Sequence, residues 1–193
     1  MRSYLRLTGG RKLQSPKGIG TRPTTSRVRE AVMNLIGPRI QGSNWLDICS
    51  GSGVMSCEAL QRGAKRVLAI EKDKQTAKIC KSNLMTVASA LIEKKSVEVI
   101  CQEVISLLKK GCNQYVSGDE KNSQFDLVYF DPPYGSKMYS IVLEQLLEGN
   151  WLKQDSLVIC EHSSSIELDV PDRWIEQGKK VYGNSALLIL SSP

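Results

Sequence analysis

Four consecutive residues, Asp131, Pro132, Pro133 and Tyr134, form the stretch of this sequence best suited to chemistry. They close an apolar run, and two adjacent prolines remove two backbone donors, so neither strand nor helix continues through them. The Asp131 carboxylate and the Pro132 carbonyl, held outward by Pro133, could accept both hydrogens of an aromatic amine and expose its lone pair. Tyr134 offers a face for base stacking, worth about 1–3 kcal/mol. We expect these residues to be catalytic; the alternative is a rigid surface turn capped by Asp131.

A second group of residues is suited to binding a cofactor. Gly51 and Gly53 flank Ser52 between an apolar run and a stretch compatible with a helix. Glycines let the backbone approach a ligand closely, and a following helix N-terminus presents unpaired N–H groups. Glu71 ends the next apolar run, where an acid can accept the hydroxyl hydrogens of an adenosine ribose. Ser56 replaces the third glycine of the dinucleotide fingerprint, which favours another adenosine-bearing cofactor.

The elements that must position these residues are strands alternating with helices. Continuous runs of Val, Ile and Leu are typical of strands buried on both faces of a parallel sheet. With helix-compatible stretches between them, they predict an α/β fold with a mostly parallel, doubly wound sheet. An antiparallel hairpin over 179–190, turning at Gly183-Asn184, should close the chain. The five expected parallel strands are 44–49, 66–71, 97–101, 125–130 and 156–161.

The N-terminal part of the chain differs in charge from the rest. Residues 1–40 hold nine Lys/Arg against one acid, a net charge of +8, so residues 41–193 carry −2 of the total of +6. A phosphate backbone is the commonest partner of such a basic segment, although a solvated arm has the same composition. We expect a basic extension over 1–43 and one compact domain over 44–193. Within the extension, 21–36 should form a helix, after an extended arm or small hairpin. Thr24, Thr25 and Ser26 offer capping hydroxyls, and Gly37-Pro38 should end the helix.

Composition bears on location in the cell, on metal binding and on the state of the cysteines. No apolar run reaches the roughly 18 residues of a membrane span, and the first residues lack a signal-peptide core. The six cysteines are scattered without a CxxC pair, and His162 is the one histidine, so a metal site is not expected. We therefore expect a cytoplasmic monomer with reduced thiols. The segment 111–124 should be a loose surface loop.

These motifs together resemble a known family. "DPPY" closing the fourth strand and "LDICSGSG" at the first are similar to amino-methyltransferases that act on nucleic acid. "TRPTTSRVREAVMNLI" resembles the signature helix of the RsmD-like family of 16S rRNA (guanine-N2) methyltransferases, and the likeness extends over nearly the whole chain. The resemblance implies a Rossmann-like class I methyltransferase fold, S-adenosylmethionine as cofactor and 16S rRNA, within the small ribosomal subunit or free, as partner.

The resemblance also implies site residues. Glu103 stands where the family has a shorter aspartate that meets the adenine amine, and the segment holding Arg11 and Lys12 is shorter than in the family. The implied cofactor-binding residues are Asp47, Ser50, Gly51, Ser52, Gly53, Glu71, Glu103 and Asp131. The implied substrate-binding residues are Arg22, Thr24, Arg27, Arg29 and Tyr134.

The expected function is methyl transfer from S-adenosylmethionine to the exocyclic N2 amine of a guanine in 16S rRNA. Two alternatives stay open at this point. The same machinery serves adenine-N6 methyltransferases of RNA or DNA, and the same fold could serve a non-catalytic RNA-binding or ribosome-assembly protein. His162 follows the fifth strand, where a structural role and a substrate contact are both compatible with its type.

Overall fold

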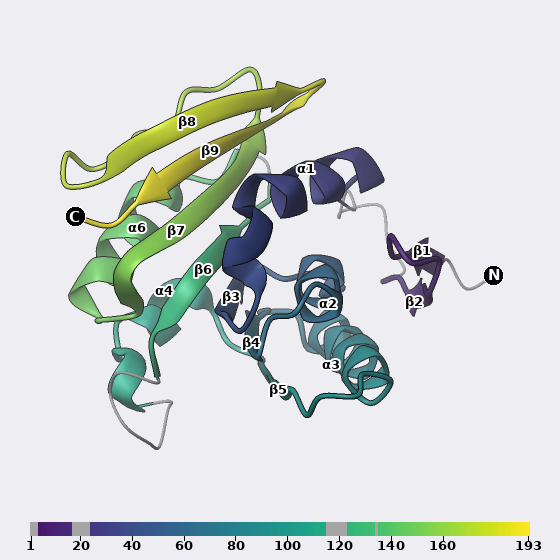
Figure 1. The fold of residues 1–193 in the computed structure, drawn as a ribbon. Helices are drawn as coiled ribbons and strands as arrows, with labels where there is room; N and C mark the ends of the chain where they lie inside the picture. The colour runs from purple at the N-terminus through teal and green to yellow at the C-terminus, as the bar shows by residue number, and fades with distance from the viewer. Residues whose placement is uncertain (1–3, 17–23, 115–122, 134) are drawn as a thin grey trace.

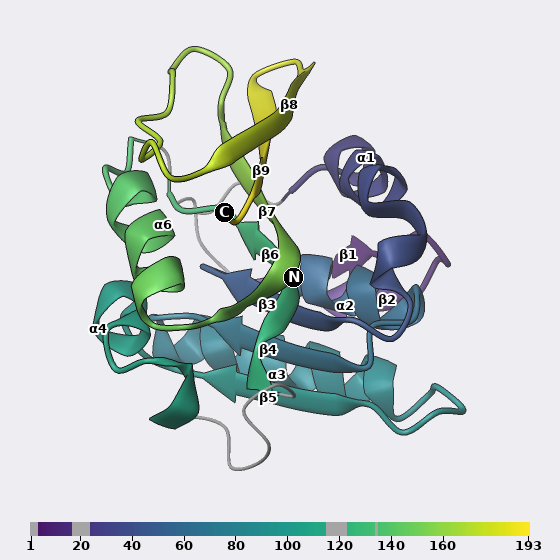
Figure 2. The ribbon, with the colours of Figure 1, turned by 60° about the vertical axis from the view of Figure 1, so that its left-hand side comes forward.

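The computed structural model describes residues 4–16, 24–114, 123–133 and 135–193, and its main feature is a seven-stranded sheet. The strand order is β5-β4-β3-β6-β7-β9-β8. The five strands from β3 to β7 run parallel to one another, and β9 runs antiparallel to both β7 and β8. Figure 2 shows this sheet from its side. The strands are β3 (Asn44–Ile48), β4 (Arg66–Ile70), β5 (Ser96–Ile100), β6 (Phe125–Phe130), β7 (Leu152–Ser163), β8 (Ile175–Tyr182) and β9 (Ser185–Ser191).

Helices cover both faces of the sheet, and each face has its own core. Figure 1 shows α1, α2 and α3 on one side and α4 and α6 on the other. Side chains along each strand alternate between the two cores, so that Trp45 and Tyr129 pack on the α1 side while Leu46 and Phe130 pack on the α6 side. The helices are α1 (Ser26–Ile36), α2 (Val54–Gln61), α3 (Lys74–Ala88), α4 (Val104–Leu108) and α6 (Tyr139–Glu148).

The predicted fold class is therefore confirmed. All five expected parallel strands are present, and the last of them begins earlier than expected, at Leu152. The register between β6 and β7 shifts between Phe125 and Leu127, which accommodates this longer strand. The C-terminal hairpin turns at Gly183 and Asn184, as the sequence predicts. In the sheet order, β3 lies between β4 and β6, which makes its carboxyl end the point where the strand order reverses.

The N-terminal segment contributes to the same core as the sheet. β1 (Tyr4–Arg6) and β2 (Lys12–Gln14) form an antiparallel hairpin, the second of the two forms expected for this segment. Leu7 and Leu13 are buried in the cluster that contains α1 and α2. α1 begins after Thr25, whose hydroxyl accepts from the Val28 N–H at 3.3 Å, and ends at Gly37 with φ +51°.

Two further expectations concern loops and special sites. The segment 111–124 is anchored at both ends, because Cys112 lies in the short 3₁₀ helix η2 (Cys112–Gln114) and is buried, as is Ser123; residues 115–122 lie outside the described residues. Among the described helices, none is both long and apolar enough for a bilayer crossing. No group of three or more His, Cys, Asp and Glu side chains in the described ranges is placed to hold a metal ion.

Candidate active site

The glycine turn after β3 has a backbone shape that requires glycine. Gly51 and Gly53 have φ of +53° and +73°, and the Gly53 N–H donates to the Ser50 carbonyl at 2.8 Å. A Cβ added to Gly53 would lie 2.6 Å from Cys80 Sγ on α3. The turn thus packs directly on α3, which lets α2 begin immediately after Gly53.

Glu71, just past β4, fixes this turn from the side. Its Oε2 accepts from the Gly51 N–H at 3.0 Å, and its Oε1 accepts from the Asp73 N–H at 2.9 Å. Each carboxylate oxygen keeps a second lone pair for another donor. The predicted pairing of the glycine turn with Glu71 is therefore present in the fold, at the carboxyl ends of two adjacent parallel strands.

Asp47, an implied cofactor-binding residue, lies beneath the glycine turn. It is 1% exposed and does not line the cavity described below; instead its Oδ2 accepts from the Ser56 N–H at 3.2 Å and the Ser56 hydroxyl at 2.5 Å. Burial raises its pKa to about 7, against the lowering effect of the two Ser56 bonds. Asp47 thus supports the turn from beneath, and its direct contact with the cofactor stays a prediction. Gly53 likewise lies behind the wall, against Cys80.

The Asp131 segment follows β6 and is hydrogen-bonded to the neighbouring strand β3. The Asp131 N–H donates to the Ile48 carbonyl at 3.3 Å, which continues the β3–β6 ladder by one residue. Pro132 is buried and Pro133 is exposed, and the Pro133 carbonyl accepts from the Ser136 N–H at 3.1 Å in the turn that follows. Tyr134 lies outside the described residues, so the predicted stacking face stays a prediction.

These two regions share one cavity of about 320 Å³. Ser50, Gly51 and Ser52 contribute the glycine turn, and Glu71 and Glu103 the ends of the strands on one side. Asp131, Pro132 and Pro133 form the opposite wall. The sequence motifs that are far apart in the chain are thus brought to one site at the carboxyl edge of the sheet.

Glu103 lines this cavity and also caps α4. Its Oε1 accepts from the Ile105 N–H at 3.0 Å and its Oε2 from the Ser106 N–H at 2.8 Å. Burial tends to raise its pKa, but these donors outweigh burial and the net pKa lies below the usual value. The longer side chain therefore folds back onto its own helix, where it stays negatively charged at the cavity wall.

The expected substrate-binding residues other than Arg29 divide into three groups. Thr24 lines the cavity. Arg27 is exposed on α1 with its guanidinium carbon 5.9 Å from the centre of the Tyr182 ring, outside the cavity wall. Arg22, like Tyr134, lies outside the described residues.

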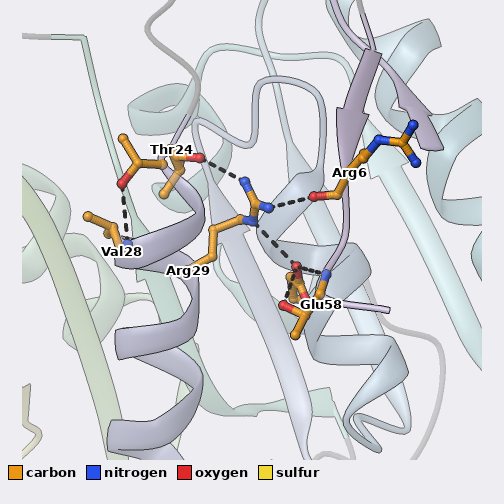
Figure 3. Close-up of polar contacts among 7 residues, drawn as sticks. Arg6, Thr24, Val28, Arg29 and Glu58 are labelled. Atoms are coloured by element: carbon orange, nitrogen blue, oxygen red, sulfur yellow. Dashed lines mark hydrogen bonds and ion pairs between the residues drawn. The ribbon is translucent and has the colours of Figure 1, made fainter. Parts of the chain in front are cut away.

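Arg29, the remaining expected substrate-binding residue, is buried and paired within the protein. It is 5% exposed, and its guanidinium donates to Glu58 Oε1 at 3.3 Å, to the Thr24 carbonyl at 3.0 Å and to the Arg6 carbonyl at 2.6 Å (Figure 3). The same Glu58 oxygen accepts from the Thr8 N–H and hydroxyl at 3.0 and 3.1 Å. Arg29 therefore joins the N-terminal hairpin, the start of α1 and α2. All three guanidinium nitrogens therefore have protein partners, and a contact between Arg29 and the substrate stays a prediction.

Several residues that line the cavity were not predicted from the sequence, and Glu161 is one of them. Glu161, near the end of β7, is 4% exposed and lines the cavity, and the Tyr129 hydroxyl donates to its Oε2. Burial, reinforced by Asp131 and Glu161, holds the pKa of Tyr129 well above its ordinary value, which keeps this donor protonated. The available signal is that Glu161 is the one acid in the otherwise apolar run 157–161, at its carboxyl end. The adjacent His162 is buried away from the cavity, with its Nδ1 2.9 Å from the Ser163 carbonyl.

Fold and site together define the class of this protein. A doubly wound sheet with an antiparallel final hairpin, a glycine turn with an acid beside it, and Asp-Pro-Pro at the next strand end make a Rossmann-like methyltransferase domain. The chain belongs to the family described as Conserved hypothetical protein 95, which matches residues 6–191. The resemblance to the RsmD-like family found in the sequence is thereby confirmed.

Individual relatives agree with this placement. The Ribosomal RNA small subunit methyltransferase D of Haemophilus influenzae is 36% identical over 174 residues, which cover 90% of this chain and 84% of that protein. The protein of the same name from Escherichia coli K12 is 30% identical over 178 residues, 92% of this chain and 82% of its own length. A solved structure of a provisionally named Escherichia coli methyltransferase superposes with a TM-score of 0.80 at 29% identity and covers 98% of both chains.

Proposed function

We propose that this protein transfers a methyl group from S-adenosylmethionine to the exocyclic N2 amine of a guanine in 16S ribosomal RNA. The observation that carries the proposal is the shared cavity, in which the Gly51 turn and Glu71 face the same space as Asp131 and Pro132. A donor held on one wall and an amine held on the other would meet without any further conformational element.

The residues present fit an adenosine-bearing sulfonium cofactor. Glu71 has a lone pair left on each carboxylate oxygen for the ribose hydroxyls, and the bare backbone at Gly51 allows close approach. Glu103 supplies a carboxylate for the adenine amine. When bound, S-adenosylmethionine supplies an electrophilic methyl group on a positively charged sulfur.

The opposite wall supplies what the nucleophile needs. An exocyclic amine on a base is a weak nucleophile because its lone pair is delocalised into the ring. The Asp131 carboxylate and the Pro132 carbonyl accept its two hydrogens, which localises the lone pair on the nitrogen. These residues act by positioning and hydrogen bonding, with no covalent intermediate on the protein. A base paired in a helix must first leave the stack to enter the cavity.

Ribosomal RNA is supported as the substrate by the relatives and by charge. The relatives from Haemophilus influenzae and Escherichia coli are named small-subunit ribosomal RNA methyltransferases. The +8 net charge of residues 1–40 is suited to a phosphate backbone, and exposed Arg27 lies within that segment.

The proposal is tested with labelled S-adenosylmethionine and small ribosomal subunits from cells that lack the protein. The wild type should label a guanosine, identified as N2-methylguanosine by mass spectrometry of the digested RNA; N6-methyladenosine as the product would overturn the guanine assignment. Asp131→Ala should abolish transfer and leave S-adenosylmethionine binding, measured by calorimetry, within about threefold of wild type. Asp172→Ala, at an exposed aspartate outside the cavity, is the matched control and should transfer normally. Normal turnover by Asp131→Ala would remove the acceptor role.

A further inference from the structure

We propose that Glu161 is a specificity-determining residue that reads guanine by accepting the N1–H next to the reactive amine. The inference rests on the proposed function and adds to it the means by which the cavity distinguishes one amino base from another. Three observations support the inference. β6 and β7 place the carboxylates of Asp131 and Glu161 side by side, Glu161 is buried, and Glu161 already makes hydrogen bonds within the protein.

The sheet places Glu161 beside Asp131. β6 and β7 are parallel, and Phe130 pairs with Cys160. The residues that follow this pair, Asp131 just past β6 and Glu161 within β7, are therefore neighbours. Parallel strands lie about 4.8 Å apart, and successive side chains alternate between faces. Both carboxylates therefore lie on the face that carries Tyr129, and both line the cavity.

Glu161 is held rigidly with one oxygen still to be satisfied. The Tyr129 hydroxyl donates to Oε2, and the Tyr139 hydroxyl donates to the Glu161 backbone carbonyl at 2.8 Å. Within the described part of the chain, no hydrogen bond is made to Oε1. Because Glu161 lines the cavity and Oε1 is not among the buried side-chain atoms without a partner, Oε1 is open to a donor that a ligand brings into the cavity.

Among the amino bases, guanine supplies that donor. Its N2 amine adjoins a ring N–H at N1, so an amine held by Asp131 brings a second donor towards the neighbouring strand. The N6 amine of adenine and the N4 amine of cytosine each adjoin a ring nitrogen with a lone pair, which a carboxylate repels. A buried carboxylate at Glu161 would therefore favour guanine and reject the other two bases.

A structural role for Glu161, as the acceptor that satisfies Tyr129, makes a different prediction. Loss of such a role would lower transfer to every substrate by the same factor. Base recognition instead changes the ratio between two substrates that differ at N1. 2-Aminopurine provides this comparison, since it keeps the amine at C2 but has a lone pair in place of N1–H. It also lacks the O6 carbonyl, a difference that is the same for the wild type and for a Glu161 variant.

The experiment uses small-subunit RNA joined by splinted ligation, with either guanine or 2-aminopurine at the labelled position, assembled into subunits. The wild type should prefer guanine by about 10- to 100-fold in kcat/KM, the range expected for one hydrogen bond to a charged group. In Glu161→Gln the amide oxygen can still accept from Tyr129, while the amide nitrogen donates into the cavity. The preference should then fall at least tenfold, mainly through loss of transfer to guanine.

Two further variants make the result decisive. Tyr129→Phe removes the hydroxyl but keeps the Glu161 carboxylate, so the preference for guanine should persist even where both rates fall. Glu144→Gln makes the same substitution at an exposed glutamate of α6 and should match the wild type. An unchanged preference in Glu161→Gln, with N2-methylguanosine still formed, would overturn this inference alone. Absence of N2-methylguanosine from the wild type would overturn the proposed function and this inference together.

Discussion

Replacement of Arg29 by methionine tests the buried ion pair that joins the N-terminal hairpin to the rest of the protein. Arg29 and Glu58 have side chains 6% and 1% exposed, so the variant leaves a buried carboxylate with the two Thr8 donors as its remaining partners. Removing one member of a buried pair costs about 3–5 kcal/mol, because the other charge stays desolvated. The carbonyls of Thr24 and Arg6 are only partly buried, and water can replace the lost donors there. We therefore expect a loss of about 3–5 kcal/mol in the free energy of unfolding.

The assay is urea unfolding of both the variant and a matched control. Arg27→Met makes the same change two positions away on the same helix, where the guanidinium is exposed above the Tyr182 ring, and should cost less than about 1 kcal/mol. A shift in the midpoint at constant slope would show that stability has changed rather than the compactness of the unfolded state. The double variant Arg29→Met with Glu58→Met should lose less than the sum of the single losses, since no charge is then left buried. If Arg29→Met unfolds within 1 kcal/mol of Arg27→Met, the pair does not anchor the hairpin as described.

Two other predictions concern the residues beneath the glycine turn. Asp47 has its pKa raised from 3.8 to about 7 by burial, so the folded state holds this proton more tightly than the unfolded chain and stability falls as pH rises from about 4 to 7. Its share of that loss is on the order of 4 kcal/mol, and Asp47→Asn should remove it, as urea midpoints measured between pH 4 and 8 would report. Gly53→Ala should cost about 1–3 kcal/mol, because φ is +73° and the new methyl meets Cys80 Sγ; combining it with Cys80→Ala should recover the part due to the clash.

Each of these two predictions has a clear contrary outcome. If wild type and Asp47→Asn lose stability in parallel as pH rises, the buried carboxylate is not the group responsible. If Gly53→Ala is equally destabilising with and without Cys80→Ala, close packing on α3 does not contribute and the backbone conformation accounts for the whole cost.

The sequence predicted the framework because the framework depends on local signals. Runs such as 125–130 are apolar at every position except Asp126, as burial on both faces of a parallel sheet demands, and the structure confirms them as strands. The capping position of Thr25 and the stop at Gly37 were also readable, since both depend on neighbours within one helical turn. From these elements, the meeting of Gly51, Glu71 and Asp131 follows, because parallel strands end at one edge.

The partners of individual side chains could not be predicted in this way. Arg29 and Glu58 are 29 positions apart, and their pairing depends on how α1 and α2 pack, which no local pattern encodes. Asp47 belongs to the apolar run itself, so a motif gives its position but not whether it faces the cavity or the core beneath the turn. Glu161 required knowledge that β7 lies next to β6, with Cys160 level with Phe130. Side-chain roles at this site are therefore set by tertiary packing.

The cavity wall runs from Leu5 and Thr24 near one end of the chain to Glu161 and Ser185 near the other. During synthesis the strands with the glycine turn emerge well before the last hairpin, whose β9 carries Ser185 and borders β7. A nascent chain can therefore build the glycine-turn side of the cavity first and must wait for its final residues to complete the wall. Loss of a few residues from the C-terminal strand would thus disable an enzyme whose recognised motifs all remain intact.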